Sequence, residues 1–172
     1  DGIPHLPDGE SLPPMEMNCI ENHLRESLAA NYKDRKLIIS RTANDCNTHL
    51  QELGNQNQTA MQKVEALIRF HVQMMMHRFE DYHVMTHEWI HLTEPHLGEF
   101  TNQRRNYVQQ LESIIQDGID KHEMKTIIPY VAVLTILSSV RGLEFWQRSR
   151  KRISAEEMEN NMVTHLISGL KK

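Results

Sequence analysis

The chain has 172 residues, which suits one domain, or one domain with a small appended module, and excludes a large multidomain enzyme. Hydrophobic residues make up 39% and charged residues 24%, a composition typical of a folded globular protein rather than a disordered one. The net charge of −4 excludes a surface coated in positive charge but leaves room for a local basic patch.

Cysteine content and hydropathy narrow the class further. Cys19 and Cys46 are too few for a disulfide framework and form no CxxC pair for zinc or redox chemistry. No apolar run approaches the ~20 residues that a membrane-spanning helix requires, and the first residues carry no basic leader. We therefore expect a cytoplasmic protein with no membrane partner.

Helical periodicity dominates the chain after residue 14. Four of the six prolines precede that point and discourage a long helix there. Beyond it, apolar residues recur at alternating spacings of three and four, which predicts helices over residues 34–53, 61–75, 78–92, 97–118, 127–146 and 154–170. Gly118 is the expected stop of the fourth helix, and Ser154 with Glu157 forms a capping-box pattern before the last.

The stretch over residues 127–146 is apolar almost all round, so it must be buried or covered by a partner. No alternating strand pattern competes anywhere, and the predicted fold class is all-α.

A histidine-rich string occupies the predicted third helix. His87 to His91 reads HExxH, in which two histidines clasp zinc while Glu88 acts as general base, and His83 lies one turn earlier. Such a short pattern arises easily by chance in a chain with 11 histidines. We favour a solvated histidine face with Trp89 in the core and no metal, and keep a zinc-dependent metallohydrolase as the alternative.

Methionine and aromatic residues recur on the second, third and fourth predicted helices. Such side chains either fill a core or line an adaptable apolar pocket for a small molecule. The candidate ligand-binding residues are Phe70, Met74, Phe79, Tyr82, Met85, Trp89, Phe100 and Tyr107.

Other chemistry has no motif behind it. The sequence contains no GxSxG, P-loop or GxGxxG pattern, so we expect no cofactor. A dense basic run, interpreted as a solvated loop, follows the apolar stretch at Arg148, Arg150, Lys151 and Arg152.

The string from Ser27 to Ile38 resembles the junction between the recognition helix and the next helix in TetR-type transcriptional regulators. The family's leucine, histidine, phenylalanine and lysine positions are taken by Leu28, Asn31, Tyr32 and Arg35, whereas Ala29 replaces a tyrosine. Upstream, Gly9, residues 13–15 and Ile20 resemble the landmarks that open the family's DNA-binding helices. The stretch from Ile20 to Leu28 is shorter than a complete helix-turn-helix.

The resemblance continues downstream over most of the chain. Residues 86–92, Phe100, residues 104–107, residues 111–118 and the last helix resemble regulatory domains of TetR members. In those regulators the HEW string followed by a histidine and a leucine recurs without proteolytic activity. The resemblance therefore implies a transcriptional regulator and not an enzyme.

What the resemblance implies is a homodimeric repressor that binds a palindromic operator and is released by a small apolar inducer. Residues 1–36 would form an incomplete helix-turn-helix module, and residues 37–172 a ligand-binding and dimerisation domain. Candidate DNA contacts are Ser27, Asn31, Lys33 and Arg35. The last two helices would form the dimer interface through Val133, Leu137, Val140, Met158, Met162 and Leu166. A helical binding domain that has lost DNA binding is a further alternative.

Overall fold

The computed structural model describes the backbone of residues 14–148 and 152–172, and side chains at residues 26, 31–147 and 152–172. Its elements are α1 (Pro14–Asn55), α2 (Ala60–His77), α3 (Phe79–His87), the short 3-10 helix η1 (Glu88–His91), α4 (His96–Asp120), α5 (Pro129–Arg141), α6 (Leu143–Arg148) and α7 (Ala155–Leu170). The all-α prediction is confirmed. Over these described ranges the sole β-pairing is a single bridge between Met124 and Lys171.

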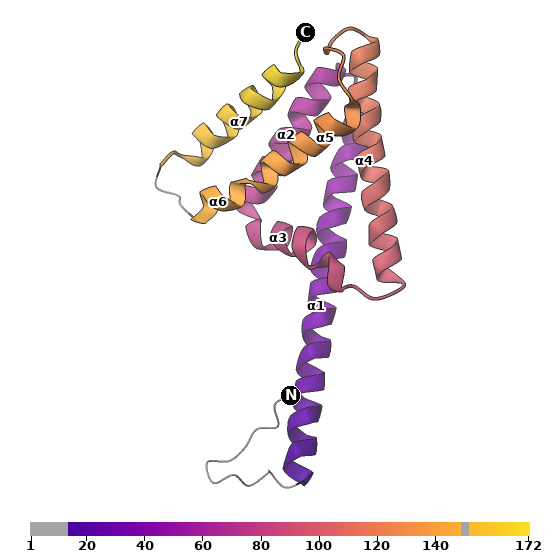
Figure 1. The fold of residues 1–172 in the computed structure, drawn as a ribbon, viewed down its shortest axis with the longest axis vertical. Coiled ribbons are helices and arrows are strands. Elements are labelled where there is room, and N and C mark those ends of the chain that lie inside the picture. The colour runs from indigo at the N-terminus through magenta and orange to yellow at the C-terminus, as the bar shows by residue number, and fades with distance from the viewer. Residues whose placement is uncertain (1–13, 149–151) are drawn as a thin grey trace.

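Helix α2 is the central element of the fold. It contacts every other α-helix, with α4 and α7 on different sides of it (Figure 1). Its start is fixed by Thr59 and Gln62, whose side chains each accept a hydrogen bond from the other's backbone N–H. Apolar residues cover most of its circumference, with Leu67, Ile68 and Val72 almost completely buried. Its polar stripe includes Arg69 and Gln73, whose side chains donate to the Glu159 carboxylate of α7.

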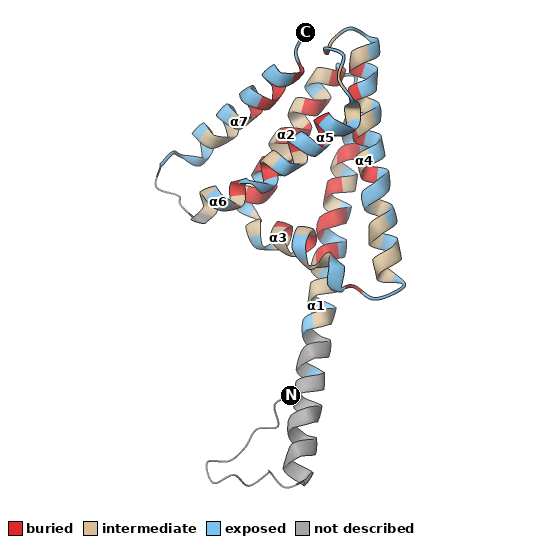
Figure 2. Cartoon of the chain, viewed as in Figure 1, coloured by how far each residue is buried: buried red, intermediate tan, exposed pale blue. Residues whose placement is uncertain are grey.

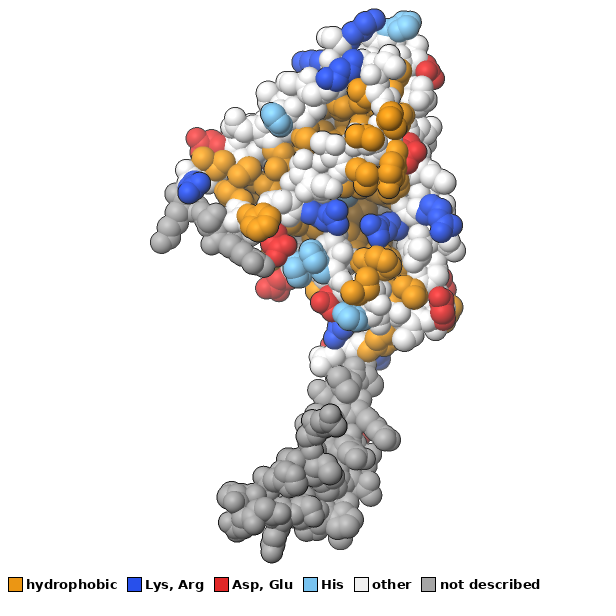
Figure 3. Space-filling view, in the orientation of Figure 1, with side chains coloured by type: hydrophobic (Ala, Val, Ile, Leu, Met, Phe, Trp, Pro, Cys, Tyr) orange, Lys and Arg blue, Asp and Glu red, His pale blue; other side chains and the backbone are white. Residues whose placement is uncertain are grey.

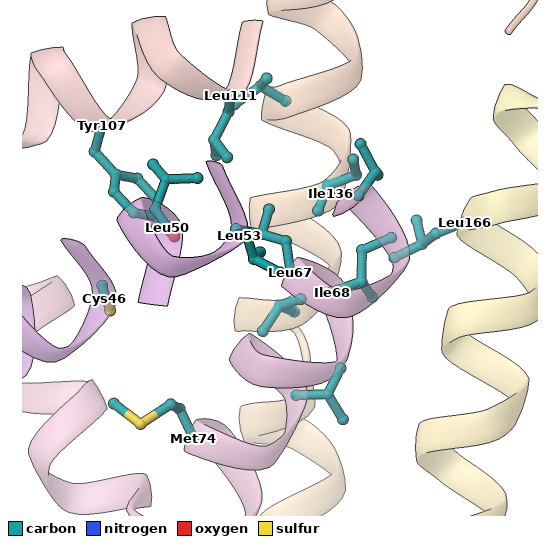
Figure 4. Close-up of a cluster of buried hydrophobic side chains, with 14 of the residues drawn as sticks. Cys46, Leu50, Leu53, Leu67, Ile68, Met74, Tyr107, Leu111, Ile136 and Leu166 are labelled. Carbon is teal, nitrogen blue, oxygen red and sulfur yellow. The ribbon is translucent and has the colours of Figure 1, made fainter. Parts of the chain in front are cut away.

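The predicted apolar stripe of α1 is confirmed. Ile39, Ala43, Cys46, Leu50 and Leu53 are all buried, and they form one face of the helix where it packs against α2, α3 and α4 (Figure 2). Figure 4 shows part of this core, in which side chains of α1, α4, α5 and α7 meet those of α2.

Two predicted helices are interrupted. The stretch over residues 127–146 divides into α5 and α6 at Gly142, where a Cβ atom would lie only 3.1 Å from the Ser139 carbonyl oxygen. The stretch over residues 78–92 leaves the α-helix after His87 and continues as η1. This tighter turn brings Trp89 against Phe100 of α4, with ring centroids 5.9 Å apart.

Gly118 does not stop α4, which continues to Asp120. A Cβ atom at residue 118 would lie 2.9 Å from the Met124 side chain and 3.0 Å from Ala60, so glycine is needed here for close packing. The helix instead ends through His122, whose φ of 60° is left-handed, and through backbone bonds from Glu123 and Met124 to the Gly118 carbonyl.

The last helix begins as predicted, because Ser154 and Glu157 form a reciprocal capping box. None of the described helices is both long enough and apolar enough to cross a lipid bilayer.

Candidate ligand-binding site

A cavity of about 520 Å³ lies between α1, α3, α4 and α5, with part of α2 at its floor. Its walls are mostly apolar and aromatic, and they include Met85 and Trp89 on one side and Val133 and Leu137 on the other. A cavity of this size with a few polar groups suits a small organic molecule.

The floor of the cavity is a buried network of three rings. The Nδ1 atom of His71 lies 3.0 Å from the Tyr82 hydroxyl, and its Nε2 atom lies 2.7 Å from the Tyr107 hydroxyl. His71 meets both tyrosine rings edge-on. All three residues also line the cavity, so the network presents polar atoms in an otherwise apolar wall.

Burial keeps this network neutral. It lowers the pKa of His71 to about 4, with a smaller contribution from His49, and raises the pKa of both Tyr82 and Tyr107. At neutral pH one His71 nitrogen therefore carries a proton and donates a hydrogen bond, while the other accepts a hydrogen bond. One tyrosine hydroxyl thus donates to the histidine and the other accepts from it. Both ring nitrogens are thus fully used.

Three arginines give the cavity a basic side. Arg104 and Arg105 of α4 and Arg141 of α5 line it, and all three are exposed. The guanidinium carbon of Arg104 lies 5.2 Å from the centre of the Trp89 ring, within range of a cation–π contact. Figure 3 shows basic side chains in blue between patches of orange apolar side chains on this face. The cavity thus combines an apolar interior with cationic groups at the surface.

Five of the eight predicted ligand-binding residues line this cavity: Tyr82, Met85, Trp89, Phe100 and Tyr107. The other three, Phe70, Met74 and Phe79, do not. Phe70 stacks on His49 at 4.0 Å, and Phe79 packs beside His83. Met74 is buried in the core near Arg78.

Sequence reasoning missed His71 and the three arginines. A signal for His71 was available, because a polar residue between Ile68 and Val72 in an apolar stripe must find buried partners. The arginines had no such signal, since their position on the cavity follows from how α4 and α5 pack together.

Comparison with protein families gives a match over most of the chain. Residues 57–170 match the family model described as the tetracyclin repressor-like C-terminal domain. The chain belongs to the TetR family of transcriptional regulators. This is a family without enzymatic activity. A search of curated proteins gives no match.

Solved TetR-family structures share the fold of this chain at low sequence identity. A TetR/AcrR regulator from Thermobifida fusca superposes with a TM-score of 0.68 and 16% identity over 80% of this chain and 73% of its own. The TetR-family regulator PfmR from Thermus thermophilus gives 0.70 and 12%, covering 88% and 82%. AibR, solved in complex with isovaleryl coenzyme A and operator DNA, gives 0.71 and 16%, covering 93% and 88%.

The metallohydrolase alternative is wrong for this TetR-family chain. The helix ends inside the HExxH string, so His87 belongs to α3 and His91 to η1. Glu88 forms an ion pair with Arg35 at 3.2 Å, and its carboxylate lies 3.9 Å from Nε2 of His91. The assignment to a family without enzymatic activity is the interpretation that holds.

Helix α1 is connected to the cavity wall by three polar contacts. Arg35 pairs with Glu88, the Tyr32 hydroxyl lies 2.9 Å from the Thr93 hydroxyl, and the Lys36 amine lies 3.2 Å from Nε2 of His96. Since η1 also carries Trp89 of the cavity, the segment that follows α3 contacts both α1 and the cavity.

The predicted DNA contacts fall along α1. Asn31 and Lys33 are exposed, whereas Arg35 is half-buried in its ion pair with Glu88. The side chain of Ser27 and residues 1–13 lie outside the described part of the chain. The helix runs without interruption through residues 27–38, where a junction of two helices was expected, and across the expected domain boundary after residue 36.

The predicted dimer residues fall on different faces of α5 and α7. Val133 and Val140 are 1% and 0% exposed within a single protomer, so they are not available to a partner. Val133 and Leu137 line the cavity instead. The apolar residues that α5 and its start expose are Ile128, Tyr130, Val131 and Leu134. On α7, Met158 and Met162 are half-buried, and Leu166 borders a groove against α5.

In the basic run, Arg152 is exposed, and residues 149–151 and the side chain of Arg148 are not described.

Proposed function

We propose that this TetR-family regulator is a repressor that acts as a homodimer on a palindromic operator and is released by an effector with an apolar body and an anionic group. The observation that carries the effector class is the cavity of about 520 Å³ with its three bordering arginines. A purely apolar inducer, the expectation from sequence, would leave those cations unused.

Acyl thioesters of coenzyme A have this mixed chemistry. The acyl chain is apolar, while the coenzyme carries phosphates that arginine side chains bind through charge-assisted hydrogen bonds. AibR, whose fold this chain shares, was solved with isovaleryl coenzyme A and operator DNA. We therefore take a short acyl-coenzyme A as the effector, with its acyl group in the cavity and its phosphates near Arg104, Arg105 and Arg141.

A displacement caused by effector binding would be transmitted to α1 through its contacts with η1 and with the loop after η1. A ligand that moves Trp89 also moves Glu88, and Glu88 is paired with Arg35 of α1. The exposed Asn31 and Lys33 are the candidate DNA contacts of the described side chains. A ligand that prefers one position of α1 changes operator affinity by its difference in affinity for the two positions.

The test combines DNA selection and fluorescence anisotropy with calorimetry of acyl-coenzyme A binding. The protein is used to select sites from a random duplex library, and the selected duplex is then followed by fluorescence anisotropy as isovaleryl coenzyme A is added. We expect selection of a palindrome, release by the acyl thioester and weaker release by coenzyme A alone. Replacing Arg104 or Arg141 by alanine is expected to weaken acyl-coenzyme A binding about 10-fold or more, because each charge-assisted hydrogen bond contributes ~1.5–3 kcal/mol.

Lys121→Ala is the matched control, since Lys121 is an exposed cation at the far end of α4 and pairs only locally with Asp117. Equal affinity of the arginine variants and the wild type for acyl-coenzyme A would contradict the effector class. Ligand binding without any selected DNA would favour the helical binding domain that has lost its operator.

The exposed apolar face of α5 is the proposed dimer surface. Ile128, Val131 and Thr135 border a groove between α5 and α7 whose other wall includes Leu166 and Leu170. Ile128 and Val131 are 67% and 53% exposed in the single chain, and contiguous apolar surface of this kind is typical of a subunit interface.

Val131→Glu places a charge in that surface and is expected to convert the dimer to a monomer, as measured by analytical ultracentrifugation. Leu37→Glu is the matched control, because Leu37 is an apolar residue on α1 that is at least as exposed as Val131 and lies outside this surface. A dimer that survives Val131→Glu and dissociates with Leu37→Glu would place the interface elsewhere.

A further inference from the structure

Three metal-ligating side chains converge on the outer face of α3. His83 and His87 lie one turn apart, with their rings stacked at a centroid distance of 4.1 Å. Glu144 of α6 faces both: its Oε2 lies 4.0 Å from Nδ1 of His83 and 3.9 Å from Nε2 of His87. One ligand atom from each residue lies within 4.8 Å of the other two. We propose that His83, His87 and Glu144 bind one divalent transition-metal ion.

Hydrogen bonding prepares His87 to coordinate through Nε2. Its Nδ1 lies 3.1 Å from the His83 carbonyl oxygen and 3.0 Å from the Thr86 hydroxyl. That hydroxyl donates to the Tyr82 carbonyl at 2.9 Å, so both neighbours of Nδ1 are acceptors and Nδ1 carries the proton. The neutral ring then has its lone pair on Nε2, the atom that faces Glu144. Metal-binding histidines commonly donate their other nitrogen to a backbone carbonyl in this way.

The distances fit a small ion better than direct bonds between the side chains. Separations of 3.9 and 4.0 Å are too long for hydrogen bonds from imidazole to carboxylate. Ligands of a tetrahedral zinc ion, with bonds near 2.1 Å, stand ~3.4 Å apart. The two separations from the Glu144 oxygen would have to shorten by about half an ångström, and the two histidine nitrogens, which lie within 4.8 Å of each other, would approach through rotamer adjustment.

The donor set selects the class of metal. Two imidazole nitrogens and one carboxylate oxygen suit zinc, and also copper, nickel or cobalt, but not magnesium or calcium, which prefer oxygen ligands. The side chains of His83, His87 and Glu144 are 35%, 47% and 20% exposed, so the site is accessible and leaves room for water as a fourth ligand.

The elements that carry the ligands are both anchored to α2. Helix α3 packs directly against α2, and Gln147 of α6 donates to the Met75 and Met76 carbonyls of α2 at 2.9 and 3.2 Å. A bound ion would join α3 directly to α6 beside the cavity, since Thr86 on α3 and Arg141 just before α6 both line it. The metal would thus hold α3 in one position, independently of the effector.

The experiment is calorimetric titration of the tag-free, chelator-treated protein with zinc, followed by titration with cobalt, whose visible spectrum reports nitrogen and oxygen coordination. We expect one zinc ion per chain and no response to magnesium. His83→Ala, His87→Ala and Glu144→Gln should each weaken zinc binding at least about 100-fold, because loss of even a residue that supports a metal ligand typically costs ~10–100-fold. Far-UV circular dichroism of each metal-free variant checks that the helices are retained.

His91→Ala is the matched control, because His91 belongs to the same sequence string but faces Glu88 and lies outside the cluster. It should bind zinc like the wild type. The proposal is overturned by absence of saturable zinc binding, by unchanged affinity in the Glu144→Gln protein, or by equal loss in His91→Ala. The result does not depend on effector or operator binding, so it is separable from the proposed function.

Discussion

The cavity floor and the outer face of α3 both present histidine to polar neighbours, yet the settings are opposite. His71 is 3% exposed, and each of its nitrogens is taken by a tyrosine hydroxyl. His83 and His87 lie at the surface and face a carboxylate at distances too long for hydrogen bonds. The same imidazole is therefore a fixed part of the fold in one place and a group free to bind a ligand in the other.

The comparison shows that the degree of burial determines whether a histidine has a structural role or is available to bind a ligand. In the interior, a ring without partners is costly, so the hydrogen bonds of His71 are structural and bear directly on stability. At the surface, water forms hydrogen bonds with any ring nitrogen that lacks a protein partner. The nitrogens of His83 and His87 that face Glu144 therefore do not destabilise the protein when no ligand is bound to them.

The largest expected effect comes from removing the buried ring's nitrogens. His71→Phe leaves the Tyr82 and Tyr107 hydroxyls without their shared partner inside the protein. At ~1–3 kcal/mol for each of the two orphaned groups, we expect a loss of about 2–6 kcal/mol in the free energy of unfolding, measured by urea denaturation at neutral pH. A loss under ~1 kcal/mol would contradict a structural role for the network.

A companion variant separates polar satisfaction from packing. Adding Tyr82→Phe and Tyr107→Phe to His71→Phe removes both orphaned hydroxyls, so part of the lost stability should return. If the triple variant is simply the sum of its parts, the three residues do not act as one network.

The next effect is on pH dependence. The pKa of His71 is lowered to about 4 in the folded protein, against an ordinary value of 6.5. Between these values the unfolded chain binds a proton that the folded one does not, so acidification from pH 6.5 to 4 should destabilise the fold, by about 3 kcal/mol in total from this group. The contribution is fully present above pH 6.5 and is lost as pH falls through 4.

The measurement is urea denaturation between pH 7 and pH 4.5, compared with His71→Gln, which offers a donor and an acceptor but does not titrate. The difference between the two proteins should grow in favour of the variant as pH falls. Parallel curves would show that His71 does not titrate across this window.

The smallest expected effect is on stability when a surface histidine is removed. His83→Ala in metal-free protein is expected to change the free energy of unfolding by less than about 0.5 kcal/mol, because the ring is partly exposed. With zinc present, the wild type should gain thermal stability that the variant does not. A large loss in the metal-free variant would mean that His83 is structural, like His71.

Periodicity made the helices predictable, because burial of one face imposes a spacing that can be read without knowing the neighbours. The α1 stripe from Ile39 to Leu53 is the clearest case. Breaks such as the one after His87 were not predictable, since they depend on contacts with residues far away in sequence. Glu88 meets Arg35 across 53 positions, and Trp89 meets Phe100 on another helix.

The candidate site was predictable only in part for the same reason. Residue type identified Tyr82, Met85 and Trp89, but the face that each residue of α5 presents could not be read from a stretch that is apolar all round. Val133 was therefore assigned to the partner's side when it lies on the cavity side. Likewise, nothing in the sequence places Glu144 beside His83 and His87, because α3 and α6 are brought together only by packing on α2.

Helix α5 is a wall one helix thick. Val133 and Leu137 border the cavity, while Val131 and Thr135 border the groove on the outer side. In a dimer built on that groove, whatever tilts α5 to admit a molecule on one side displaces the surface on which the other subunit rests. The two cavities then cannot fill independently, and the occupancy curve of the dimer departs from a simple hyperbola.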